Sequence, residues 1–214
     1  HALERMLGLL VEKNGYKQFF YYPKTGQFTH DTSYILAQYV NTAEGLKNQL
    51  NNFEHISFDV FDTLVRREYY VPDYAKLLLG KSLVQKGLVS NAHEFVKMRN
   101  TAEFEVRKAK NFVGDVTIFE TYDYLAKQLG WSNEQAHNLA EQEFAYDLQM
   151  ILPKDEMVDI FNELILAGKQ VTVASDTYYT KDQVTLMLAK VGISVGFDLL
   201  VSSDLGKRKD SGTL

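Results

Sequence analysis

The chain has 214 residues, 45% of them hydrophobic, which is enough apolar material to bury one sizeable core or one core with a smaller lobe. Its formal net charge of -5 and pI near 5.6 give no basic face that would attract a phosphate backbone, so we expect no nucleic-acid partner. Cysteine is absent and no apolar stretch approaches the ~18 residues of a membrane span, so we expect no disulfide, no thiolate metal site and a cytoplasmic location.

Residues 1–52 carry no recognisable chemistry, and we predict an N-terminal segment of helices and a hairpin whose role is unknown. The Pro-Lys-Thr-Gly of residues 23–26 lies between two aromatic runs and predicts a hairpin turn. A second helical pattern covers roughly residues 32–50. A first helix is predicted from apolar residues spaced along one face, namely Leu3, Met6, Leu7 and Leu10.

The next segment begins with a short buried strand, predicted over residues 55–60, and then becomes helical from Pro72 to about Met150. Pro72 suits a first helical position, and Gly130 stands where a helix would end. We predict a bundle of about four helices. Two capping boxes support it, in which a hydroxyl and a Glu or Gln side chain each satisfy a free amide: Thr117 with Glu120, and Ser132 with Gln135.

The last third of the chain alternates helix and strand. One apolar helix face is predicted over residues 157–165, followed by a β-branched strand at 171–175. A further helix opens with Thr180 and Gln183, and the next strand is predicted at 197–203. A strand, helix and strand of these lengths form a βαβ unit in a parallel sheet. Ligands of such sheets collect beyond the carboxyl ends of the strands.

Polar residues with reactive side chains occur at these strand ends. The segment ISFDVFDTLV places Asp59 at the end of an apolar run, and a carboxylate there can attack phosphorus to form an acyl phosphate. The reaction also needs a hydroxyl for the phosphoryl oxygens, a lysine, and Mg²⁺ on oxygen ligands. Ser175 and a lysine among residues 207–209 follow in order. A polar turn capped by Thr63 is the alternative interpretation of the first segment.

Three segments resemble motifs of the haloacid dehalogenase (HAD) superfamily. FDVFDTLV is similar to its first motif, VTVASDTYYTKDQVTLML to its second, and the lysine of GKRKDSGTL to its third. The resemblance covers about residues 54–214 and implies an α/β fold with a Rossmann-like parallel sheet. The core would comprise residues 53–68 and 151–214, and residues 69–150 would form a helical cap of the first type.

A narrower resemblance concerns a subgroup of these proteins. SFDVFDTLVRR, MRNTAEFEVRKAK, ASDTYYT and KDSG together are similar to HAD proteins found with, or fused to, glycosyltransferases of bacterial surface-polysaccharide synthesis. This resemblance implies a small phosphorylated substrate and a glycosyltransferase domain or partner.

The resemblance implies roles for individual residues. Asp59 would be the nucleophile and a Mg²⁺ ligand, and Phe61 would offer its backbone carbonyl to the metal. Ser175 and the amide of Asp176 would hold phosphoryl oxygens. Lys209 would be the third-motif lysine, because it is followed by the glycine expected three places on.

Further expectations concern the phosphate and the metal. Thr63 and Arg66 are candidates for binding the substrate phosphate, although a surface salt bridge explains Arg66 or its neighbour Arg67 equally well. The acidic fourth motif of the family would follow a further helix and strand, and the chain stops first. We therefore expect a fragment whose metal site is incomplete and whose core lacks its C-terminal part.

Phe61 departs from the phosphatase pattern. Phosphatases of this superfamily usually carry a second aspartate two places after the nucleophile, which protonates the leaving group and then activates water. Phe61 can do neither. Asp62 is the nearest substitute, but it points away from Asp59 unless the turn begins at Phe61, because adjacent strand positions face opposite sides. The cap could supply an acid instead.

Two groups of residues in the helices and loops have both a functional and a structural interpretation. Arg99, Glu103 and Arg107 recur on one helix face, either as paired exposed charges or as cap residues that face the site. The tyrosine pairs at 69–70 and 178–179 could stack on a sugar ring, although packing at a domain seam is more common.

Three functions remain open on the sequence. The first is Mg²⁺-dependent hydrolysis of a phosphate ester, on a sugar or a small metabolite, through an aspartyl-phosphate. The second is a non-catalytic module that partners a glycosyltransferase. The third is dehalogenase-like cleavage of a carbon-halogen bond, which an aromatic residue at position 61 also permits.

Overall fold

The computed structural model of the chain describes residues 13–17, 19–22, 26–30, 42–69, 71 and 73–214. The chain divides into two compact units, His1–Gln49 and Leu50–Leu214. The candidate site lies wholly within the second.

The first unit contains a two-stranded antiparallel hairpin. Strand β1 (Phe20–Tyr22) pairs with β2 (Gln27–Thr29), which confirms the predicted hairpin. The rings of the cross-strand pair Tyr21 and Phe28 are 5.2 Å apart. Helix α3 (Ala43–Leu50) corresponds to the end of the second predicted helix. The first predicted helix, the turn residues 23–25 and residues 32–41 lie outside the described residues.

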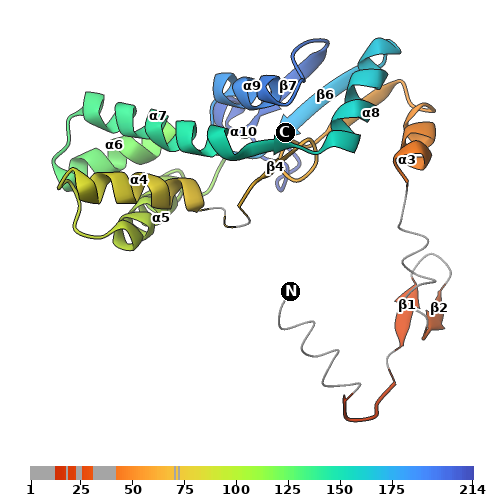
Figure 1. Cartoon of the computed structure of the whole chain (residues 1–214), viewed down its shortest axis with the longest axis horizontal. Helices are drawn as coiled ribbons and strands as arrows, with labels where there is room; N and C mark the ends of the chain where they lie inside the picture. The colour runs from red at the N-terminus through yellow and green to blue at the C-terminus, as the bar shows by residue number, and fades with distance from the viewer. Residues whose placement is uncertain (1–12, 18, 23–25, 31–41, 70, 72) are drawn as a thin grey trace. The chain divides into compact units, whose positions relative to one another are not determined.

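The core of the second unit is a parallel sheet with the strand order β3-β6-β7 (Figure 1). Its strands are β3 (His55–Phe58), β6 (Gln170–Ser175) and β7 (Phe197–Val201). Strand β3 ends two residues earlier than predicted, because the amides of Leu64 and Val65 both donate to the carbonyl of Val60 and close a turn there. Strand β7 also ends early, since Ser202–Leu205 form the short helix α10.

Two helices complete the βαβ arrangement beside this sheet. Helix α8 (Asp155–Leu166) precedes β6, and α9 (Lys181–Lys190) connects β6 to β7. The ring of Phe161 in α8 packs against two strands, 5.2 Å from Phe58 and 5.5 Å from Phe197. The predicted βαβ unit with parallel strands is thus confirmed, and the chain has an α/β fold with a parallel sheet at its core.

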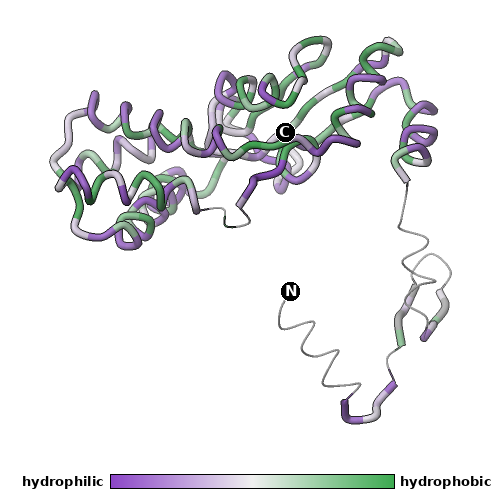
Figure 2. Tube along the Cα trace, in the orientation of Figure 1, coloured by the Kyte–Doolittle hydropathy of each residue, from purple (hydrophilic) through white to green (hydrophobic). Residues whose placement is uncertain are grey.

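Within the described residues four helices lie between β3 and α8 in the chain, as predicted: α4 (Tyr74–Gln85), α5 (Ala92–Ala109), α6 (Ile118–Leu129) and α7 (Asn133–Met150). Helices α4 and α5, α5 and α6, α6 and α7, and α4 and α7 pack against each other. Polar and apolar residues alternate along them, as Figure 2 shows, so each helix has an inner and an outer face.

The helix ends follow the predicted signals. Both capping boxes, Thr117 with Glu120 and Ser132 with Gln135, are present, as is a third that Thr180 forms with Gln183. Gly130 ends α6 in the left-handed conformation with φ of 70°. Pro72 lies outside the described residues.

A second small sheet lies where the chain leaves the sheet core for the inserted helices and returns from them. The sequence did not indicate this sheet. Strand β4 (Val65–Arg67) pairs antiparallel with β5 (Ile151–Pro153). Each strand has only three residues, which is too short for an alternating pattern to be recognised. This pair brings the beginning and the end of the helical insertion together. No helix within the described residues is long and apolar enough to cross a membrane.

Candidate functional site

Segments at the carboxyl end of the parallel sheet meet around Lys209. The Nζ of Lys209 donates to the Asp59 carboxylate at 2.5 Å, across 150 positions of the sequence. The backbone amide of Lys209 lies 3.1 Å from each carboxylate oxygen of Asp176. The Asp59 and Lys209 side chains keep 45% and 37% of their surface exposed, so their ion pair remains accessible to a ligand.

Ser175 ends β6 with a hydroxyl that is available for hydrogen bonding. Its side chain is wholly buried, and its Oγ has no hydrogen-bond partner in the part of the chain that the structure describes. A buried polar group without a partner costs about 1–3 kcal/mol. Such a group commonly marks a place where a ligand or a water is bound.

The turn after Asp59 decides how Phe61, Asp62 and Thr63 are presented. Asp62 has φ of 60°, a left-handed conformation that aspartate tolerates better than most residues, and its side chain is exposed. Its amide donates to the carbonyl of Val65 at 2.7 Å. The turn therefore includes Phe61, and the alternation expected of a straight strand does not apply to Asp62. Thr63 is half-buried in the same turn.

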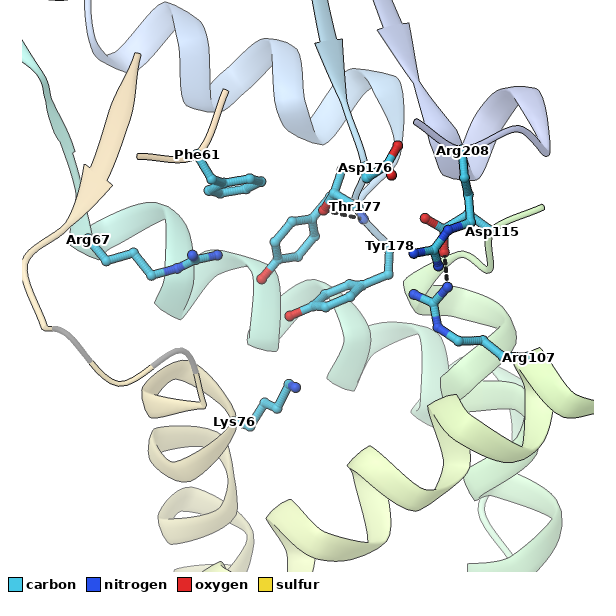
Figure 3. A pocket seen from close by; sticks show the side chains of 10 residues that line it. Phe61, Arg67, Lys76, Arg107, Asp115, Asp176, Thr177, Tyr178 and Arg208 are labelled. Carbon is cyan, nitrogen blue, oxygen red and sulfur yellow. Dashed lines mark hydrogen bonds and ion pairs between the residues drawn. The ribbon is translucent and has the colours of Figure 1, made fainter. Parts of the chain in front are cut away.

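A pocket of about 320 Å³, here called the site pocket, is lined by residues that include Phe61, two positions after Asp59, and Arg208, the neighbour of Lys209 in the chain (Figure 3). Phe61 and Asp176 line it, whereas Asp59, Ser175, Thr63 and Lys209 are not among its lining residues. Thr177 and the aromatic residues Tyr178 and Tyr179 also contribute to the wall. Four cationic and two acidic residues complete the lining: Arg67, Lys76, Arg107 and Arg208 with Asp115 and Asp176.

The two arginines after the first motif point to different places. Arg66 is exposed, its Nε donates to the carbonyl of Pro153 at 3.3 Å, and it lines a separate pocket at the start of α8. Arg67 lines the site pocket, with its guanidinium 4.5 Å from the centre of the Phe61 ring. A role of Arg66 in phosphate binding stays a prediction, and Arg67 is the arginine that the fold directs to the pocket.

Arg67 is fixed by a buried carboxylate of α7. Its Nε and Nη2 donate to the two oxygens of Asp147 at 2.6 and 2.7 Å, and the Tyr179 hydroxyl donates to Asp147 at 2.8 Å. Burial by itself would lower the pKa of Arg67, but the hydrogen bond and charge of Asp147 outweigh it and raise that pKa. This contact joins the strand pair, the helices and the loop after β6.

The predicted helix face of Arg99, Glu103 and Arg107 is not a row of exposed charges. Arg99 is wholly buried, and its Nε and Nη2 donate to Glu143 of α7 at 3.1 and 2.9 Å. It also pairs with Glu103. The Tyr122 hydroxyl donates to Glu143 at 2.7 Å. Burial would lower the pKa of Arg99, but the charge of Glu143 raises it well above the usual value.

Asp115 is a pocket residue that the sequence did not single out. It is buried, its Oδ1 lies 2.5 Å from Nη1 of Arg107, and its Oδ2 accepts a hydrogen bond from Ser202 at 2.6 Å. Ser202 in turn accepts from the amide of Thr177 at 2.8 Å. Asp115 lies in a loop without a motif, so no sequence signal identifies it.

The loop between α5 and α6 also approaches the Lys209 segment through two glycines. Gly114 has φ of 71°, and a Cβ placed there would lie 2.4 Å from the carbonyl oxygen of Gly206. Any other residue at Gly114 would push the two loops apart. The helical insertion is therefore closely packed on the segment that supplies Lys209.

Tyr178 and Tyr179 line the site pocket and pack against each other. Their ring centres are 4.6 Å apart, and burial raises the pKa of both hydroxyls. The guanidinium of Arg99 lies 4.4 Å from the centre of the Tyr178 ring. Stacking on a sugar stays a prediction. Tyr69 is 45% exposed, and Tyr70 lies outside the described residues.

The oxygen donors near Asp59 fit the ligand preference of Mg²⁺. This hard cation takes one or two protein carboxylates and completes its shell with water and substrate oxygens. The Asp59 carboxylate and the carbonyl of Phe61 are donors of this type. Among the described residues, no group of three or more His, Cys, Asp or Glu side chains could hold a metal. Any Mg²⁺ here would depend on water and substrate for most of its ligands.

The chain resembles solved structures but matches no family model and no curated sequence. Two solved structures of L-2-haloacid dehalogenase from Xanthobacter autotrophicus, one with chloropropionic acid covalently bound, each match with a TM-score of 0.40 and 16% identity. Each match covers 72% of this chain and 58% of the dehalogenase chain, so this chain spans less than two thirds of the length of the dehalogenase.

Proposed function

We propose that the protein is a HAD-type hydrolase that cleaves a phosphate ester of a sugar or small metabolite through an aspartyl-phosphate on Asp59. The observation that carries this proposal is the contact of Lys209 with both Asp59 and Asp176. Segments that resemble three motifs of one reaction centre thereby meet at one edge of the sheet. A solvated lysine with no partner would not have supported this function.

The reaction proceeds in two displacements. A carboxylate oxygen of Asp59 attacks the phosphorus, the new oxygen-phosphorus bond forms, and the ester bond to the leaving alcohol breaks. The leaving oxygen takes a proton from solvent. Water then attacks the phosphorus of the acyl phosphate, which releases inorganic phosphate and restores the Asp59 carboxylate.

The surrounding groups stabilise the charge that develops on the phosphoryl oxygens. The free hydroxyl of Ser175 and the amide of Asp176 would donate to these oxygens, and Lys209 would offset the negative charge between nucleophile and phosphate. Thr63 would contribute from the turn after the nucleophile. Mg²⁺, held by Asp59 and the carbonyl of Phe61, would supply further charge neutralisation.

The helical insertion would cover the reaction centre as a cap. Lys76 and Arg107 line the site pocket from the inserted helices, and Arg67 lines it from β4, so the insertion contributes two of the four cationic residues of the pocket wall. Phe61 occupies the place of the usual acid, which favours substrates whose alcohol leaves without strong protonation. The similarity to the glycosyltransferase-associated subgroup supports a sugar phosphate and a glycosyltransferase partner.

The test is a screen of the protein against a panel of phosphate esters. Release of inorganic phosphate with Mg²⁺ is expected for the wild type, and Asp59→Asn should reduce it by at least about a thousandfold, since the nucleophile is lost. The unfolding midpoint of Asp59→Asn should stay close to the wild type, because exposed ion pairs contribute about 0–1 kcal/mol.

Asp62→Asn is the matched control. It changes the same chemical group three positions later in the same turn, and asparagine also tolerates the left-handed backbone there. It should keep most of the activity. Phosphate release that survives Asp59→Asn would contradict the proposal.

A non-catalytic module is the second candidate, and Phe61 is the observation that favours it. In that case no phosphate ester would be hydrolysed, and beryllofluoride, which mimics an aspartyl-phosphate, would not bind at Asp59. Halide release from 2-haloacids without added metal would instead point to carbon-halogen cleavage.

A further inference from the structure

The loop between α5 and α6, residues 110–117, contacts the two core loops that carry the second and third motifs. Asp115 in this loop accepts a hydrogen bond from Ser202, the first residue of α10. The amide of Ile118, the first residue of α6, donates to the carbonyl of Tyr178 at 2.7 Å. The close approach of the two loop glycines joins the same segments. The helical insertion is therefore attached to the core here as well as through the paired strands β4 and β5.

The Asp115 carboxylate is held in one orientation. Its Oδ1 accepts a hydrogen bond from the amide of Val116 at 2.8 Å and lies 2.5 Å from Nη1 of Arg107. Figure 3 shows this carboxylate beside the Arg107 guanidinium, on the side of the pocket where Arg208 also lies. The Asp115 side chain is buried, so solvent hardly competes for these contacts. The second oxygen, Oδ2, is thereby directed at Ser202.

The Ser202 hydroxyl has one hydrogen to donate and two acceptors within reach. The Asp115 oxygen is 2.6 Å from its Oγ, and the carbonyl of Thr177 is 3.2 Å away. The carboxylate is closer and charged, so it takes the hydrogen. The Ser202 oxygen accepts in turn from the amide of Thr177 at 2.8 Å. A hydroxyl that donates to a carboxylate is a better acceptor, so Asp115 strengthens the hold of Ser202 on this amide.

Thr177 is the residue after Asp176, which meets Lys209. The last residues of β6 and β7 are partners in the parallel sheet, so the loop after β6 and helix α10 leave the sheet side by side. Because the peptide bond is planar, holding the Thr177 amide also holds the carbonyl of Asp176. The Asp176 carboxylate accepts the amide of Lys209 at 3.1 Å. The contact with the insertion thus reaches the loop that carries two of the proposed phosphate-binding groups.

We propose that Asp115 is a positioning residue for the phosphoryl site. Through the Ser202 hydroxyl it orients the peptide between Asp176 and Thr177, so that the Asp176 amide points at the phosphoryl oxygens. Asp115 and Ser202 act through Thr177 and do not themselves contact the phosphoryl group. This inference rests on the proposed function, because it explains how the inserted helices keep the phosphate-binding loop of that same site in order.

The first test is Ser202→Ala, which removes the linking hydroxyl with little change in volume. The affinity for inorganic phosphate, measured by calorimetry, should fall about tenfold, because the Thr177 amide loses its acceptor. Ser203→Ala is the matched control. Ser203 is the next residue of α10, and its hydroxyl donates to the carbonyl of Tyr179 at 2.6 Å. The control should change phosphate affinity by less than about twofold. Equal effects of the two variants, or no effect of Ser202→Ala, would overturn the proposal.

The second test compares Asp115→Asn with Asp115→Ala. Both variants lose the ion pair with Arg107, but asparagine keeps an oxygen that can accept the Ser202 hydrogen. Phosphate affinity should stay within about threefold of the wild type in Asp115→Asn and fall about tenfold in Asp115→Ala. A role in stability alone predicts the same affinity in both variants, and that result would contradict the proposal.

The double variant Asp115→Ala/Ser202→Ala shows whether the two residues act through one contact. It should lose no more phosphate affinity than Ser202→Ala alone, because the contact is already broken in the single variant. Independent losses that multiply to about a hundredfold would mean that Asp115 does not act through Ser202.

Hydrogen exchange of the Thr177 amide reports on the loop without any need for activity. Its exchange should be at least about tenfold faster in Ser202→Ala than in the wild type. The two proposals fail differently. Phosphate binding through Asp59 that stays unchanged in Ser202→Ala and Asp115→Ala removes only this inference. Failure of the wild type to hydrolyse any phosphate ester and to bind phosphate or beryllofluoride removes the proposed function, and this inference falls with it.

Discussion

The protein holds two ion pairs of opposite character in its second unit. Asp59 and Lys209 at the sheet edge keep 45% and 37% of their side-chain surface exposed. Arg99 and Glu143, between helices α5 and α7, are both wholly buried. Both pairs join segments far apart in the sequence, but only the exposed pair is open to a ligand.

The difference in burial separates a pair that belongs to the packing between two helices from a pair that is accessible at the edge of the sheet. Arg99 and Tyr122 are wholly buried, and both donate hydrogen bonds to Glu143. Burial and the charge of Glu143 raise the pKa of the Tyr122 hydroxyl well above its usual value. Perturbed pKa values often indicate active sites, but buried structural networks perturb them too. In this protein the buried guanidinium of Arg99 lies 4.4 Å from the centre of the Tyr178 ring, and Tyr178 lines the site pocket.

Of the substitutions that test the difference between the two ion pairs, Arg99→Met is expected to have the largest effect on stability. It leaves Glu143 buried without its counter-charge, and we expect the free energy of unfolding to fall by about 3–5 kcal/mol. Urea unfolding followed by circular dichroism measures the loss. Lys108→Met on the same helix is the control, because Lys108 is exposed and 3.8 Å from Glu105, and it should change stability by less than about 0.5 kcal/mol. Similar effects of the two substitutions would remove the distinction between the pairs.

The contribution of Glu103 to stability is expected to depend on pH. Burial alone would raise its pKa, but the charge of Arg99 and its hydrogen bonds lower it below the usual 4.5. A carboxyl whose folded pKa is depressed stabilises the protein above its unfolded pKa, and the contribution is lost as pH falls through the folded pKa. Glu103→Gln should therefore cost about 2 kcal/mol at pH 7. The difference from the wild type should shrink steadily below pH 4.5.

The measurement is a series of urea unfolding curves between pH 7 and pH 3. Glu105→Gln, two positions later and paired only loosely with Lys108, serves as the reference for a carboxylate on the same helix. A stability difference for Glu103→Gln that is independent of pH would contradict the charge argument.

The smallest expected change in the free energy of unfolding is a gain in stability, and it concerns Ser175 at the end of β6. Ser175→Ala removes a buried hydroxyl without a partner among the described residues, so stability should stay the same or rise by about 1 kcal/mol. Phosphate affinity and turnover should fall at the same time. Thermal unfolding and inhibition by inorganic phosphate measure the two quantities. A loss of stability above about 1 kcal/mol would show that Ser175 has a structural role instead.

Local signals in the sequence were sufficient for most elements of the second unit. The capping boxes at Thr117, Ser132 and Thr180 form as predicted, because they depend on residues three positions apart. The strand at the second motif and the parallel βαβ unit follow from β-branched runs and helix periodicity. Two predicted strands extended past their observed ends at Phe58 and Val201, because the turn after β3 and the short helix α10 after β7 begin inside the apolar runs.

The sequence by itself determined the α/β class, the four inserted helices and the candidate reactive groups Asp59, Ser175, Asp176 and Lys209, because each depends on local pattern or motif. Only the tertiary structure decided that Lys209 reaches Asp59, that Arg67 rather than Arg66 lines the site pocket, and that Arg99 is buried against Glu143. The place of Asp115 in the wall of the site pocket was likewise decided only by the tertiary structure. The physical reason is that pairing between distant charges depends on burial and chain geometry, which no spacing in the sequence encodes.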